Sequence, residues 1–312
     1  MRTSSTASDL RFGLLTSAAD RAGLHEDARR AEGDGFDLLA LTDHLDLSGA
    51  HVARLAWLPA LASAAAVTST LRFTTMIANQ DLREPAVLAC DVASLDRVSD
   101  GRYELGLGAG WNEAEYRWAG IAYAPAGQRI ARLAEVAQAV RGITSDAPGP
   151  FTLRGEYVTI DAMPRVPSVQ QPIPLRMGGA QPHMLALAAR MADIVNLLTL
   201  RDSGPTDEVL PAKIAMLGDS PAVRELSVVL VATGADDPVE AVRRALPTNP
   251  FAQRVAADLG VEAVARLPHV LAGSPGAIAE ELLRRREKYG IVSTIMPAGS
   301  APDVAPVLAR LR

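Results

Sequence analysis

The stretch DVASLDRVSDGRYELGLGAGW, residues 91–111, decides the fold class. Its first part completes a helix expected over Pro85–Val98, with proline in the first turn where it is favoured. Tyr103–Gly108 follows as a short, mostly apolar strand candidate. A longer helical run followed by a short β-like run is the unit from which parallel α/β folds are built.

The same alternation continues on both sides of this stretch. Strands are expected over Phe12–Thr16, Leu38–Asp43, Arg72–Asn79, Tyr103–Gly108, Leu175–Gly178, Asp193–Leu198, Ser227–Thr233 and Ser293–Met296. Helices are expected over His25–Asp34, Val52–Val67, Pro85–Val98, Gln128–Arg141, Pro182–Met191 and Pro275–Tyr289, with extra ones over Asp207–Met216 and Phe251–Leu267. Eight strands with intervening helices predict a (β/α)8 TIM barrel, because a doubly wound sheet would need fewer strands.

One segment interrupts the alternation. Residues 145–174 carry six prolines, and Gly155-Glu156-Tyr157-Val158 could belong to a short hairpin. Because the alternation resumes afterwards, we interpret this segment as an insertion on the barrel rim and not as a domain boundary. The chain of 312 residues is then expected to form a single domain over 1–312, with 1–9 flexible.

Composition narrows the function classes. The formal net charge is -5 and no dense Lys/Arg stripe occurs, so a nucleic-acid partner is not expected. No window reaches about 18 uninterrupted apolar residues, and the polar start lacks the apolar core of a secretory signal. We therefore expect a cytoplasmic location, without a membrane span and without export.

The sequence contains no motif for a metal site or a serine hydrolase. The five histidines are scattered without an HExxH motif, the single cysteine excludes a cysteine cage, and no GxSxG elbow occurs.

Polar residues and glycines follow four of the predicted strands. Barrel enzymes place their active sites at these carboxyl ends, so the four clusters are expected to converge on one pocket. The clusters are Thr42-Asp43-His44, Asn79-Gln80-Asp81, Gly108-Ala109-Gly110-Trp111-Asn112-Glu113 and Gly178-Gly179-Ala180-Gln181.

Asp43 and His44 carry the clearest chemistry in this set. A histidine at a strand end can give or take a proton near neutral pH, and a neighbouring carboxylate can orient it. The alternative is that Asp43 caps a loop and His44 only packs.

The glycines allow two interpretations each. Gly106, Gly108 and Gly110 follow GxGxG spacing, which does not match a nicotinamide fingerprint and instead favours close backbone approach or a sharp turn. The Gly178-Gly179 turn leads into a helix with Pro182 at its start, which is typical of an anion site at a helix N-terminus. An ordinary strand-to-helix turn is the alternative there.

Taken together, these motifs resemble the luciferase-like oxidoreductase superfamily. Residues 91–111 resemble its hallmark stretch, and Thr42-Asp43-His44, Arg83-Glu84-Pro85 and Leu175-Arg176-Met177-Gly178-Gly179 agree in order and spacing. Residues 273–297 resemble the family's last helix and strand. The chain is most similar to the coenzyme F420-dependent branch, a resemblance that covers about residues 11–299.

The resemblance implies a luciferase-like barrel that holds F420, or alternatively FMN, at its C-terminal mouth. It places His44 near the reacting carbon as catalytic acid or base, and Asp43 near the polar edge of the ring. It also implies a non-prolyl cis peptide bond at Thr75–Met76 against the back face of the ring. The remaining cofactor contacts that it implies are Asn79, Gly108, Ala109, Gly110 and Trp111 at the ring, and Gly178, Gly179, Ala180 and Gln181 at the phosphate.

These implications leave three functions open. The first is hydride transfer between the deazaflavin C5 and a small organic substrate, the second an FMN-dependent monooxygenase, and the third a non-catalytic cofactor-binding barrel. Several related sugar and alcohol dehydrogenases place a catalytic glutamate after the GxG of strand four, where this chain has Trp111. That departure disfavours a sugar-phosphate or alcohol dehydrogenase. Relatives are often dimers, so a homodimer is expected.

Overall fold

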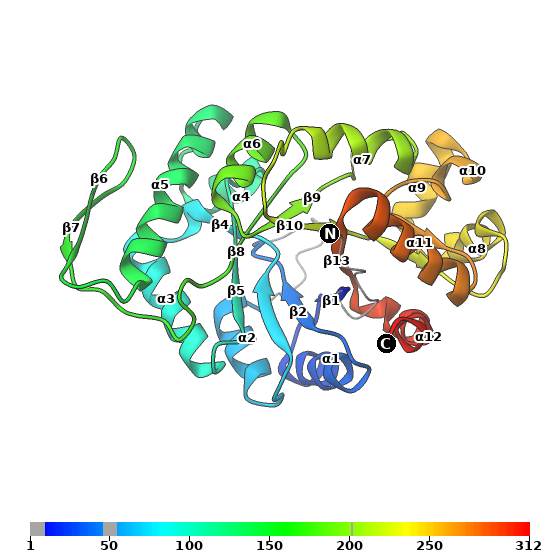
Figure 1. Cartoon of the computed structure of the whole chain (residues 1–312), viewed down its shortest axis with the longest axis horizontal. Coiled ribbons are helices and arrows are strands. Elements are labelled where there is room, and N and C mark those ends of the chain that lie inside the picture. Colours follow the sequence, from blue (N-terminus) through cyan, green and yellow to red (C-terminus); the bar gives the residue numbers. More distant parts are fainter. Residues whose placement is uncertain (1–9, 46–54, 201) are drawn as a thin grey trace, which may run out of the picture.

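A closed barrel of eight parallel strands forms the centre of the molecule (Figure 1). The computed structural model describes residues 10–45, 55–200 and 202–312. Pairing between β3 and β5, with Phe73 opposite Tyr103, closes the sheet and confirms the predicted (β/α)8 fold. The barrel strands are β1 (Arg11–Thr16), β2 (Leu38–Leu41), β3 (Arg72–Thr75), β5 (Tyr103–Gly108), β8 (Leu175–Gly179), β9 (Ile194–Leu197), β10 (Val223–Ser227) and β13 (Ile291–Pro297).

Helices cover the outside of the barrel, as Figure 1 shows. The predicted bounds of α3 (Pro85–Val98), α6 (Pro182–Met191) and α11 (Pro275–Tyr289) agree with the structure. The helix predicted over Val52–Val67 corresponds to α2 (Trp57–Ala65), and its first residues lie outside the described ranges. The others are α1 (Arg21–Gly33), α4 (Glu113–Ala119), α5 (Ala126–Thr144), α7 (Thr206–Ala215), α8 (Pro238–Ala245), α9 (Pro250–Leu259), α10 (Val261–Val264) and α12 (Ala301–Leu311). In the described part of the chain, no helix is long and apolar enough to span a membrane.

The seventh barrel strand differs from the prediction. The barrel uses β10, which ends at Ser227, whereas the predicted segment Ser227–Thr233 contains β11 (Leu230–Ala232). β11 pairs with β12 (Val270–Ala272) in a separate two-stranded sheet. The prediction was wrong because β10 carries Glu225, a charged side chain that is fully buried inside the barrel. Strands were predicted from runs of apolar residues, so the more hydrophobic segment that contains β11 was predicted in place of β10.

A second, smaller apolar cluster is formed by residues of β11 and β12 together with residues of α8 and α10. The single helix predicted over Phe251–Leu267 is divided into α9 and α10 at Gly260. Gly260 has a φ of 83°, a left-handed value that interrupts a helix and is easily adopted by glycine.

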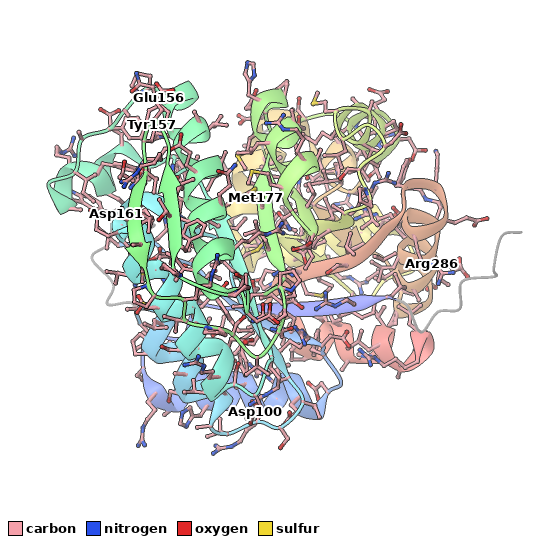
Figure 2. The ribbon with its side chains drawn as sticks, turned by 60° about the vertical axis from the view of Figure 1, so that its left-hand side comes forward. Asp100, Glu156, Tyr157, Asp161, Met177 and Arg286 are labelled. Carbon is pink, nitrogen blue, oxygen red and sulfur yellow. The ribbon has the colours of Figure 1, made fainter. Side chains whose placement is uncertain are left out.

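The predicted rim insertion contains an antiparallel hairpin, β6 (Phe151–Arg154) and β7 (Thr159–Met163). The hairpin projects beyond the ring of helices in Figure 1. Its turn, with Glu156 and Tyr157 labelled in Figure 2, lies at the end of the molecule opposite Asp100. The Glu135 carboxylate on α5 anchors this turn by accepting hydrogen bonds from the backbone N–H groups of Glu156, Tyr157 and Val158 at 2.7–2.9 Å.

A charged cluster crosses the middle of the barrel. Arg176 on β8 is fully buried and donates to both Glu104 on β5 (2.9 Å) and Glu225 on β10 (2.8 and 3.0 Å). Asn196 and Ser293 donate further hydrogen bonds to Glu225. The interior of this barrel is therefore held together by ion pairs as well as by apolar packing.

Gly106→Ala should destabilise the barrel by at least about 2 kcal/mol through overpacking. A Cβ at this position would lie 1.9 Å from the backbone oxygen of Thr75 on the neighbouring strand, which cannot move aside as a side chain could. Chemical denaturation measures the change. Gly127→Ala on α5 is the control, since its Cβ would meet nothing within 4 Å and should be neutral or stabilising by up to about 1 kcal/mol. Equal stability of the two variants would contradict the expectation.

Candidate active site at the barrel mouth

Asp43 and His44 follow β2 at the carboxyl end of the barrel. One Asp43 carboxylate oxygen, Oδ2, accepts a hydrogen bond from the backbone N–H of Asn79 (3.0 Å) and lies 3.5 Å from the Arg83 guanidinium. Burial raises the pKa of Asp43, although Arg83 and the Asn79 N–H act in the opposite direction. The Asp43 carboxyl is thus more readily protonated than an exposed aspartate.

His44 is held by a buried carboxylate that sequence reasoning missed. Both oxygens of Glu115, in the first turns of α4, lie 3.0 Å from His44 Nδ1. Glu115 also accepts a hydrogen bond from the backbone N–H of Leu45 (2.7 Å). One carboxylate therefore binds the segment after β2 to the helix that follows β5. The only sequence signal was the pair of acidic residues at 113 and 115, close to a possible helix start.

The Trp111 ring forms one side of the mouth. Its centroid lies 5.7 Å from that of His44, with the ring planes at 73°, an edge-to-face contact. Trp111 is 58% exposed, and Leu45 and Leu200, which follow β2 and β9, are also exposed. The rim near His44 thus offers apolar surface to a ligand.

Tyr116 on α4 connects two of the predicted clusters. Its hydroxyl donates towards Asn79 Oδ1 (3.1 Å), Asp81 Oδ2 (2.7 Å) and the Ala109 carbonyl (3.3 Å). Burial and Asp81 raise the pKa of Tyr116, so the hydroxyl stays protonated. Gly110 has a φ of 70°, and a Cβ there would lie 1.9 Å from the Tyr116 hydroxyl. Any larger residue at position 110 would therefore clash with the Tyr116 hydroxyl.

Ile77 occupies the space between two other glycines. A Cβ added at Gly108 would lie 3.1 Å from Ile77 Cγ2, and one at Gly178 would lie 2.7 Å from Ile77 Cδ1. These glycines therefore accommodate Ile77, a residue that the sequence did not single out. Through Ile77 the cluster after β8 is connected to the cluster after β5.

The cis peptide bond lies one residue later than predicted. It joins Met76 to Ile77, not Thr75 to Met76. Regular pairing of β3 ends at Thr75 and resumes in β4 (Ala78–Asn79), which leaves Met76 and Ile77 as the irregular residues. The Thr75 hydroxyl is buried and bonded to the Gly106 backbone oxygen at 2.7 Å, so its side chain belongs to the barrel wall.

The turn of residues 178–181 leads directly into α6. Gln181 occupies the N-cap position without a side-chain hydrogen bond to the helix, and Pro182 follows. The buried Lys213 on α7 donates to the Ala180 carbonyl (3.1 Å) and forms an ion pair with Asp202 (2.9 Å). First-turn N–H groups without a side-chain cap are suited to an anion.

These features fit a planar ring that carries an anionic tail. Met76 and Ile77 are only partly buried and supply an apolar platform, while Asp43 and Asn79 supply a polar edge. The uncapped start of α6 can hold a phosphate. Among the residues that the structure places, no group of three or more His, Cys, Asp or Glu is arranged to hold a metal ion.

Comparison with known proteins gives several curated relatives. An uncharacterized protein of Mycobacterium tuberculosis is 35% identical over 130 residues, which cover 41% of this chain and 43% of the relative. An F420-dependent glucose-6-phosphate dehydrogenase of Kineococcus radiotolerans is 30% identical over 193 residues, 59% of this chain and 55% of that protein. The chain thus spans about half the length of these two relatives.

Solved structures share the fold over nearly the whole chain. An F420-dependent secondary alcohol dehydrogenase in complex with an F420-acetone adduct has a TM-score of 0.75 at 19% identity, covering 97% of this chain and 99% of that one. A long-chain alkane monooxygenase has a TM-score of 0.80 at 15% identity, covering 96% and 91%. At such identities the likeness is one of fold. The family model described as luciferase-like monooxygenase matches residues 3–285, and the protein therefore belongs to that family.

Proposed function

We propose that the protein is an F420-dependent oxidoreductase that transfers a hydride between C5 of the deazaflavin and a small organic substrate. The observation that carries this proposal is His44, fixed by Glu115 at the barrel mouth beside an apolar platform and a polar edge. The F420-dependent relative supports the choice of cofactor. As part of the same proposal, the chain acts as one domain, in the cytoplasm and as a homodimer.

In this proposal the protein binds the ring and handles a proton. Ile77 and the backbone near Gly108 support one face, Asp43 and Asn79 meet the polar edge, and residues 178–181 hold the phosphate. When bound, the deazaflavin supplies a ring carbon that accepts or donates hydride. His44 takes or gives the accompanying proton at Nε2, the ring nitrogen not bonded to Glu115. Trp111 lines the substrate side and excludes water from it.

An FMN-dependent monooxygenase is the second candidate. The family description and the alkane monooxygenase structure favour it. Both cofactors present a similar tricyclic ring and a phosphate, so the platform and the turn of residues 178–181 would serve either.

Direct titration with each cofactor distinguishes the two candidates. We expect F420 to bind and to quench tryptophan fluorescence, because Trp111 is exposed at the mouth, whereas Trp57 is buried and the third tryptophan, Trp118, is exposed on α4. The Trp111→Phe variant is the control, and its smaller quenching would assign the signal to the mouth. A screen of small organic substrates with oxidised and reduced F420 follows. Tight binding of FMN without affinity for F420 would overturn the proposal.

A further inference from the structure

Glu115 is a buried carboxylate bonded to the segment after β2. It is 2% exposed, and its hydrogen-bond partners within residues 10–45, 55–200 and 202–312 are His44 Nδ1 and the Leu45 N–H. Within the described ranges, no lysine or arginine forms an ion pair with it. The start of α4 contributes a favourable partial positive charge, which is smaller than a full cation. Burying a carboxylate is costly without a charged partner, and His44 is the one described residue in contact with Glu115 that can carry a positive charge.

The contact also fixes which atom of His44 faces a ligand. A carboxylate accepts hydrogen bonds and cannot donate them, so Nδ1 carries the proton of this bond. In the part of the chain that the structure describes, no residue is bonded to Nε2. The Trp111 ring lies edge-to-face with the imidazole. Nε2 is therefore the nitrogen available at the mouth, protonated when the ring is charged and free when it is neutral.

We propose that Glu115 is a positioning residue that fixes the Nδ1-protonated form of His44, leaving Nε2 to exchange a proton with the substrate. The catalytic part rests on the function proposed above, whereas the effect on His44 does not. Three other charged groups lie near this pair. They are Asp43, Arg83 on the loop before α3, which lies 3.5 Å from Asp43, and Asp91, which lies 3.5 Å from Arg83.

The alternative is that Glu115 only braces two loops. Its bond to the Leu45 N–H would suffice for that role and requires no negative charge. Glu115→Gln separates the two, because the amide oxygen can still accept from Leu45 while the charge is lost. Glu113→Gln is the matched control, since Glu113 is exposed in the same helical turn, whereas the carboxylate bonded to His44 is that of Glu115.

The measurement is the nitrogen NMR spectrum of the His44 ring in cofactor-free protein, assigned by comparison with His44→Ala. The neutral ring of the wild type should carry its proton on Nδ1. Glu115→Gln should increase the share of the Nε2-protonated ring, because a glutamine NH2 group can donate to Nδ1 whereas a carboxylate cannot. Glu113→Gln should leave the tautomer ratio unchanged. An unchanged tautomer ratio in Glu115→Gln would overturn the proposal.

A second variant covers the case in which Glu115→Gln does not fold. Glu115→Asp keeps a side chain that only accepts but is one methylene shorter, so it should give more of the Nε2-protonated ring than the wild type and less than Glu115→Gln. A wild-type tautomer ratio in Glu115→Asp would contradict positioning by Glu115. With a substrate in hand, Glu115→Gln should lower kcat about tenfold with KM unchanged, because fewer His44 rings present an unprotonated Nε2 to the substrate. A changed tautomer ratio with unchanged kcat would contradict the catalytic role of His44 and leave its positioning by Glu115 intact.

Discussion

Replacing His44 with alanine should lower turnover by about 100-fold or more, the loss expected when a positioned acid or base is removed. Alanine removes an imidazole whose Nδ1 is held by a buried carboxylate and whose Nε2 has no hydrogen-bond partner among the described residues. Affinity for the cofactor should change little, because the hydrogen bonds and ring contact of His44 within the described ranges involve Glu115 and Trp111, and neither Ile77 nor residues 178–181. Steady-state kinetics and a binding titration on the same preparation measure the two effects.

The two readouts also separate the possible explanations. His25→Ala is the control for loss of a histidine elsewhere, since His25 bonds to Ser63 between α1 and α2 and lies in no predicted cluster. Unchanged turnover in His44→Ala would remove His44 from the mechanism. Loss of cofactor binding in that variant would instead assign His44 to binding.

The sequence was most informative where local signals coincide with the burial pattern. The bounds of α3 and β5 follow from Pro85, which starts the helix, and from the mostly apolar run at Tyr103–Gly108, which is almost wholly buried. Four polar clusters could be assigned to one end of the barrel because parallel strands place their carboxyl ends together. Topology thus converts positions far apart in the chain into neighbours.

The sequence failed where long-range contacts decide the local structure. The partnership of His44 and Glu115 spans 71 residues, and no periodic pattern marks the short helix that carries Glu115. The place of Ile77 depends on two glycines from different strands, which were interpreted as contacts for a ligand. β10 was missed because its buried Glu225 is satisfied by partners on other strands, so burial there does not follow hydrophobicity.

Arg176→Met should destabilise the protein by about 3–5 kcal/mol, the cost of removing one partner from a buried ion pair. Glu104 keeps Arg11 and Arg72, each at 2.7 Å, and so remains compensated. Glu225 would lose its charge compensation, because among the described residues Arg176 is its only cationic partner. Its other partners, Asn196 and Ser293, are neutral. Most of the loss should therefore arise at Glu225. Urea denaturation of the variant against the wild type measures it.

Two further variants test that assignment. Arg176→Met combined with Glu225→Gln should recover part of the lost stability, because the uncompensated charge disappears while acceptance from Ser293 is retained. Arg154→Met removes a direct ion pair with Asp161 on the exposed hairpin (Figure 2). This variant should lower the free energy of unfolding by less than about 1 kcal/mol. A loss in Arg176→Met as small as that in Arg154→Met would contradict a structural role for the cluster.

The same cluster determines how acid affects the barrel. Burial alone would raise the pKa of Glu104, but the guanidinium groups of Arg176, Arg11 and Arg72 outweigh it and lower this pKa to about 2. Because the pKa in the folded state lies below the ordinary value of 4.5, Glu104 contributes stability above about pH 4.5. That contribution is lost as the pH falls towards 2.

Without Arg176 the pKa of Glu104 should rise, so the variant has less stability to lose in acid. The stability difference between wild type and Arg176→Met should therefore shrink as the pH is lowered from about 7 to about 3, and a constant difference would contradict this linkage.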